Sequence, residues 1–140
     1  MADHAMRLMQ VIEAVLKAEV PLAGGWWATR LETPSYPVGY IDLTGSTPGH
    51  GVDRYAEEHR GVVSIWTRPG KDEAPHPAEA FRLSNLAHVA LSAVLPGDGE
   101  FTIQRLSVGP LVPSNPDGIT WGRTFTFTAT TYEAHNGTAI

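Results

Sequence analysis

The chain has 140 residues, of which 42% are hydrophobic and 18% are charged, and it contains no cysteine. This composition is typical of one globular domain, and it excludes a disulfide framework, a thiol nucleophile and thiolate metal sites. The formal net charge of −5 disfavours nucleic-acid binding. The sequence offers no apolar stretch near the ~20 residues of a membrane span and no signal peptide at its start. We therefore expect a protein made in a cytoplasm, without a membrane partner.

The first half of the chain predicts a helix and two strands. Apolar residues recur every three or four positions over residues 3–19, which indicates an amphipathic helix. Alternating apolar residues predict a strand over 36–43 and a second, central strand over 61–67. The residues between them, 44–60, are polar and rich in glycine and predict a long exposed loop.

The second half predicts a helix and two further strands. Small and apolar residues over 77–95 favour a helix that packs on a sheet. Residues 100–108 predict a strand whose apolar phase slips after Ile103, as at a β-bulge. A turn-rich connection leads to a strand over 119–131, and residues 134–140 are expected to form a flexible tail.

The last strand has the clearest pattern of the chain. Apolar residues occupy one face, and threonines occupy the other: Thr124, Thr126, Thr128 and Thr130. A strand of this length either bends or projects beyond its own domain, and a projecting strand needs a partner. Threonine is neutral and favours strands, so these four residues are candidates for a subunit contact, although a solvent-exposed sheet face explains them as well.

Together these elements predict one α+β domain over residues 1–140. Its expected architecture is a mostly antiparallel sheet of about four strands, with two helices packed on one face and a long loop between the first two strands.

The sequence shows no catalytic constellation. His50, Asp53 and His59 are of metal-ligating type, but their spacing matches no zinc signature, so we expect no metal. Adjacent carboxylates such as Glu57 and Glu58 are usually solvated in a polar loop. We therefore expect no enzyme activity and no cofactor.

Two regions are candidates for contact with a partner protein. The first is the predicted loop, because long loops are often functional. The second is a tryptophan pair, of which we expect one member to lie in the core and one to serve as an anchor. The candidate residues are His50, Asp53, Arg54, Tyr55, Glu57, Glu58, Trp26 and Trp27.

The order of these elements resembles the tail completion or tail terminator proteins of long-tailed bacteriophages, including the small gp17-like family. The resemblance covers about residues 6–133. It lies in the pattern and order of the elements, and no invariant motif supports it. The segments that carry it are 8–18, 21–23, 35–41, 62–66 and 123–129.

The resemblance implies a structural virion protein at the head-proximal end of the tail. Such proteins form a ring, typically of six subunits, that stops polymerisation of the tail tube and joins the neck. It implies a tail tube protein and a neck or head-completion protein as partners. DNA would pass through the lumen without specific binding.

Other functions stay open at this stage. A head-closure or neck ring protein is close in kind to a tail terminator. A small ligand-binding domain or enzyme would place Trp26, Tyr40, Trp66 and His88 around one pocket. An edge-pairing interaction module unrelated to phages is a third possibility.

Overall fold

The computed structural model describes residues 4–48, 56–70, 73, 76–93 and 101–133. Two helices and six strands occur in these residues. In chain order they are α1 (His4–Glu19), β1 (Trp26–Trp27), β2 (Val38–Pro48), β3 (Ala56–Thr67), α2 (Ala78–Ser92), β4 (Phe101–Val108), β5 (Val112–Ser114) and β6 (Trp121–Glu133).

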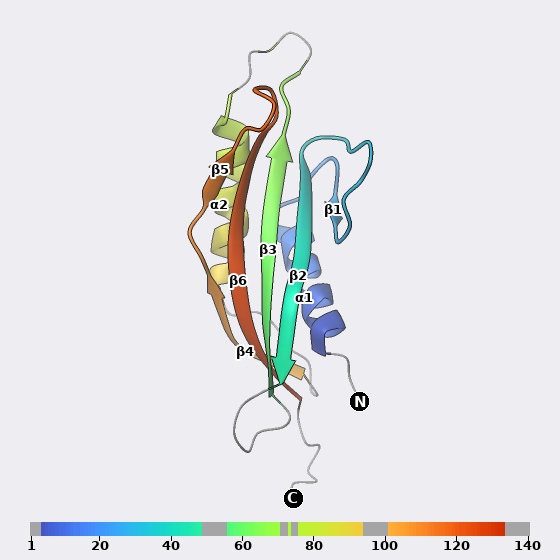
Figure 1. The fold of residues 1–140 in the computed structure, drawn as a ribbon, viewed down its shortest axis with the longest axis vertical. Helices are drawn as coiled ribbons and strands as arrows, with labels where there is room; N and C mark the ends of the chain where they lie inside the picture. The colour runs from blue at the N-terminus through green and yellow to red at the C-terminus, as the bar shows by residue number, and fades with distance from the viewer. Residues whose placement is uncertain (1–3, 49–55, 71–72, 74–75, 94–100, 134–140) are drawn as a thin grey trace, which may run out of the picture.

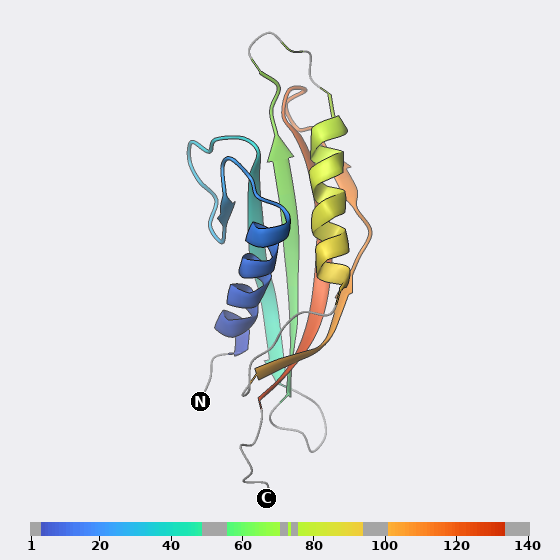
Figure 2. The same cartoon turned by 180° about the vertical axis from the view of Figure 1, so that it is seen from behind.

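All six described strands belong to one mixed sheet. The order across it is β1-β2-β3-β6-β4, and β5 pairs with β6 beside β4. The β1–β2 pair is parallel and the other four pairs are antiparallel. The sheet curls around both helices as a half-barrel (Figures 1 and 2). The other face of the sheet, here called the open face, carries no helix among the described residues.

The core lies between the helices and the concave face of the sheet. Leu8, Ile12 and Leu16 of α1 are fully buried, as their spacing of four residues predicts. Phe125 and Phe127 of β6 meet them from the sheet and are 1% exposed. Burying one such side chain contributes about 1.5–3 kcal/mol.

The predicted architecture, a mostly antiparallel sheet of about four strands with two helices packed on one face, is wrong, because the sheet is larger, mixed and curled into a half-barrel. The sheet has six strands among the described residues, and it is mixed, because the tryptophan pair adds a short parallel strand beside Gly39 and Tyr40. Two register shifts, after Leu43 in β2 and after Ile103 in β4, accompany the curl. The second shift is the bulge that the sequence predicted.

The long loop predicted over residues 44–60 is also wrong. β2 continues to Pro48 and β3 begins at Ala56, so that Ser46 pairs with His59 and Thr47 with Glu58. The polar composition misled the prediction, because backbone pairing with β6 on the other side of β3 holds the segment in the sheet. Residues 49–55 lie outside the described residues, as do residues 134–140 of the predicted tail.

Candidate interaction surfaces

The buried end of the sheet holds a histidine network that the sequence did not predict. His59 is fully buried, with Nδ1 lying 2.8 Å from the Ser46 hydroxyl and Nε2 lying 2.9 Å from the Thr131 hydroxyl. His4, which is 3% exposed, places Nδ1 2.8 Å from the same Thr131 oxygen. The network thus joins α1, β2, β3 and β6. Each of these polar groups has a partner, as burial requires.

The candidate contact residues of the predicted loop are dispersed. Glu57 is half-buried and its Oε2 lies 3.4 Å from Nδ1 of His4, so it belongs to the edge of the histidine network. Glu58 is exposed and lies 3.6 Å from the guanidinium of Arg60. The remaining four candidates lie outside the described residues: His50, Asp53, Arg54 and Tyr55.

The two tryptophans separate as predicted. Trp26 is 4% exposed, packs over Gly39 and donates its indole N–H to the carbonyl of Val20 at 2.9 Å. Trp27 is 44% exposed and donates to the carbonyl of Gly24 at 2.6 Å. Trp26 is therefore a core residue, and the role of Trp27 as an anchor stays a prediction.

The threonine row lies on the open face of the sheet, as the alternation predicts. Thr126 and Thr128 are exposed, and Thr124 and Thr130 are partly exposed. Two polar residues of β6, Arg123 and Thr131, lie among the apolar ones and have specific contacts on the concave face. Arg123 lies over the ring of Phe81 of α2 at 4.4 Å, and Thr131 joins the histidine network.

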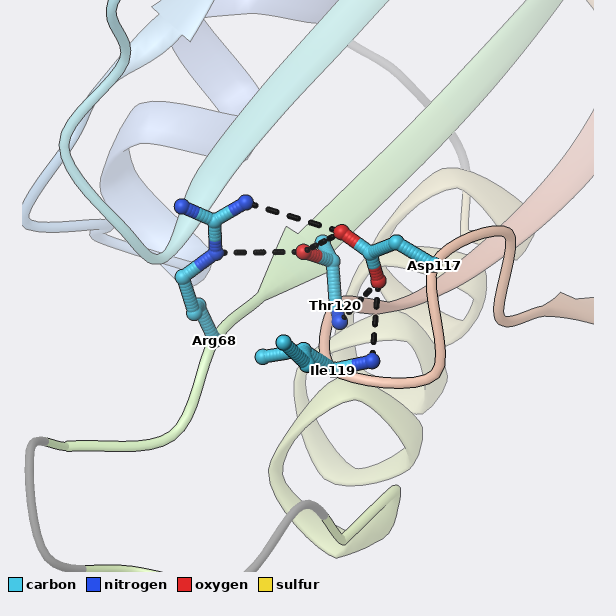
Figure 3. A network of polar contacts seen from close by, with 4 residues as sticks. All are labelled: Arg68, Asp117, Ile119 and Thr120. Atoms are coloured by element: carbon cyan, nitrogen blue, oxygen red, sulfur yellow. Dashed lines mark hydrogen bonds and ion pairs between the residues drawn. The ribbon is translucent and has the colours of Figure 1, made fainter.

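An ionic turn lies beside one end of the open face, between the end of β3 and the start of β6. The Asp117 carboxylate accepts hydrogen bonds from the backbone N–H groups of Ile119 and Thr120 and from the Thr120 hydroxyl (Figure 3). Arg68 donates from Nε to that hydroxyl at 3.1 Å and places Nη2 3.6 Å from Asp117. The turn ties two segments that are about fifty residues apart in the chain.

The same contacts perturb the acidity of Asp117. The backbone N–H of Thr120, then that of Ile119 and the Thr120 hydroxyl, lower the pKa of the carboxyl to about 2, and the Arg68 charge adds a smaller contribution. Hydrogen bonds to the ionised form produce such a shift. Asp117 is therefore a carboxylate at neutral pH, already satisfied by its own chain.

A groove crosses the open face next to this turn. Its first hollow, of about 290 Å³, lies between the 30–36 segment and the turn at Asp117. Its second hollow, of about 360 Å³, continues over β2 and β3 and shares Arg30 and Tyr40 with the first. We call it the aromatic–arginine groove, after its residues Arg30, Tyr36, Tyr40, Trp66 and Arg68.

Both arginines of the groove stack on aromatic rings. The guanidinium of Arg30 lies 4.9 Å from the ring centroid of Tyr40 and 5.6 Å from that of Trp66. The guanidinium of Arg68 lies 4.9 Å from the ring of Tyr36. Such stacking contributes about 0.5–1 kcal/mol at an exposed site and limits the orientation of the cation.

The groove differs from the pocket considered in the sequence analysis. Tyr40 and Trp66 line it, whereas Trp26 and His88 lie on the concave side of the sheet. His88 donates from Nε2 to the Gly109 carbonyl at 2.9 Å and meets the Phe125 ring edge-on. Sequence reasoning missed the arginines, because only the fold brings the 30–36 segment across the sheet.

The described residues contain no group of three or more metal-ligating side chains. In the part of the chain that the structure describes, no helix is long and apolar enough to cross a membrane.

No protein-family model matches the sequence, and no curated protein matches it either. Among solved structures, the chain is similar to a chain of the "Virion of native gene transfer agent (GTA) particle". The two chains share 17% sequence identity with a TM-score of 0.53, over 96% of this chain and 100% of the other. At this identity the similarity establishes a shared fold.

Proposed function

We propose that the chain is a structural protein of a phage-like virion. The observation that carries this proposal is the fold shared with a gene transfer agent virion chain over nearly the full length of both proteins. A match that leaves no large part of either chain unaligned supports a common architecture for the whole domain, rather than for one widespread motif. The proposed role requires neither a cofactor nor catalysis.

Within the virion, we propose a ring at the head-proximal end of the tail tube. The ring, with six copies as the expected number, would end tube polymerisation and present the joining surface for the neck. The sequence resemblance to tail terminator proteins supports this position. The partners would be the tail tube protein and a neck or head-completion protein, and DNA would pass through the lumen without specific binding.

The sheet supplies surfaces suited to a closed ring. Its two borders are different: β2 beyond Tyr40 on one side, and β4 with β5 on the other. A ring joins one edge of each subunit to a different edge of the next, which is a heterologous contact. Exposed strand edges and a neutral threonine row provide backbone groups and uncharged side chains for such contacts.

A head-closure or neck ring is the second candidate, because the same fold and edges support it equally. The position of the ring in the particle distinguishes the two roles. Immunogold labelling of isolated tails and of DNA-filled heads would locate the protein on one or the other.

The first experiment is the mass of the purified chain in solution, alone and with preformed tail tubes, followed by negative-stain imaging. A cap at one end of the tubes, or free rings, supports the proposal. A monomer that ignores tubes, and is absent from both purified tails and heads, contradicts it.

A further inference from the structure

In the part of the chain that the structure describes, some charged side chains of the aromatic–arginine groove are paired with each other, and Arg30 is not. Four charged side chains line its first hollow: Arg30, Glu32, Arg68 and Asp117. Arg68 and Asp117 form an ion pair with each other. Among the described residues, no hydrogen-bond acceptor or carboxylate lies within bonding distance of the Arg30 guanidinium, which is held by stacking on Tyr40 and Trp66. The Arg30 N–H groups are thus available to an incoming anion.

The shape of the groove favours an extended occupant. Arg30 and Tyr40 belong to both hollows, so the two form one track over β2 and β3 with Arg30 at its middle. Apolar side chains, Leu31, Pro34 and Val38, line the track beside these polar groups. A peptide segment with one acidic residue among apolar ones matches this combination of a central cation and apolar walls.

Polyanionic ligands fit the groove less well. Glu32 and Asp117 line its first hollow and Asp42 its second, and the whole chain carries a formal net charge of −5. These carboxylates repel a polyphosphate or a nucleic-acid backbone, whereas one carboxylate can meet Arg30 alone.

The occupant's carboxylate is better supplied by another protein than by a second copy of this chain. Each copy carries a formal net charge of −5, so two copies repel each other at long range.

We propose that the aromatic–arginine groove binds an extended, largely apolar peptide segment of a partner protein, with one carboxylate of that segment on the guanidinium of Arg30. Charge-assisted hydrogen bonds to a stacked, oriented guanidinium give this contact its specificity. The inference concerns partner recognition and does not depend on the position of the protein in a virion.

The test is a titration of the full ¹⁵N-labelled chain with the peptide acetyl-Val-Leu-Asp-Leu-Val-amide, which carries one carboxylate, observed by NMR. The indole N–H of Trp66 and the Nε–H of Arg30 serve as reporters. We expect saturable shifts of both signals, and binding about tenfold weaker in Arg30→Gln. Arg82→Gln is the matched control, because Arg82 is exposed on α2 and pairs only with Glu79 among the described residues.

Each other outcome overturns the proposal. Equal shifts with acetyl-Val-Leu-Asn-Leu-Val-amide would remove the role of the carboxylate. Equal shifts with inorganic phosphate would indicate an unselective anion site. A change in the mass of the chain alone on Arg30→Gln would make a second copy the occupant. An unchanged affinity in Arg30→Gln, with the backbone spectrum otherwise preserved, would exclude Arg30 from binding.

Discussion

His59 Nε2 lies 2.9 Å from the hydroxyl of Thr131, although the two residues are 72 positions apart. The same hydroxyl lies 2.8 Å from Nδ1 of His4, so that one oxygen serves two imidazole rings. A hydroxyl can donate one hydrogen bond while accepting others, which allows one ring to donate and the other to accept. This arrangement fixes the start of α1 against the first residues of β3 and the last residues of β6.

Thr131→Val is expected to destabilise the fold by ~2–4 kcal/mol, because the methyl group fills the space but offers neither buried imidazole a hydrogen bond. Urea unfolding followed by tryptophan fluorescence measures the change. Thr128→Val is the control, since Thr128 is exposed on the same strand and its replacement should cost less than about 0.5 kcal/mol. Equal losses of unfolding free energy in the two variants would show that the histidine network does not stabilise the fold.

The sequence predicted the elements in which apolar residues recur with a clear period, every three or four residues in a helix or every second residue in a strand. The apolar spacing of Leu8, Ile12 and Leu16 located α1, and the alternation around Phe125 and Phe127 located β6. Each pattern is a local consequence of one buried face, so it can be recognised without knowledge of the partner elements.

The outer part of the first hairpin could not be predicted in this way. His59 and Thr131 look like surface residues when each is considered alone. Their burial depends on hydrogen bonds to each other, to the exposed Ser46 and to His4, across three strands and a helix. The aromatic–arginine groove was missed for the same reason, because stacking of Arg30 on Trp66 joins residues that no local pattern relates.

Gly61→Ala should destabilise the protein by ~1–3 kcal/mol through overpacking. A Cβ at this position would overlap the ring of Phe127 and lie 2.7 Å from the carbonyl oxygen of Asp42. Gly45→Ala is a matched control in the neighbouring strand, because its Cβ would approach nothing closer than 3.5 Å. Thermal unfolding of both variants checks the prediction. A Gly61→Ala variant with the melting temperature of the wild type would contradict it.

Asp117 should give the fold a pH-dependent contribution at low pH. Its pKa falls from 3.8 to about 2 in the folded chain, so the ionised form stabilises the fold above pH 4, and that contribution disappears as the pH falls toward 2. The difference in melting temperature between wild type and Asp117→Asn should therefore narrow between pH 4 and pH 2.

The relative effect of each contact on the pKa of Asp117 can be measured in variants of its partners. Thr120→Ala should raise the pKa of Asp117 more than Arg68→Gln does, because the lost hydroxyl contributes more than the arginine charge. NMR titration of the Asp117 side-chain carbon measures both. A larger shift in Arg68→Gln would contradict the assignment to hydrogen bonding.

If the threonine row contacts a neighbouring subunit, then Thr126→Lys combined with Thr128→Lys should abolish assembly and leave folding intact. Both side chains are exposed in the single chain, so lysines are tolerated there. In a dry contact between subunits the two ammonium groups would lose water without gaining partners, at a cost of several kcal/mol for each ion. Gln10→Lys, at an exposed position of α1, adds one charge away from the sheet face and should assemble normally. Mass measurement with preformed tail tubes gives the result, and rings of normal size in the double variant would show that the threonine row faces solvent in the assembly.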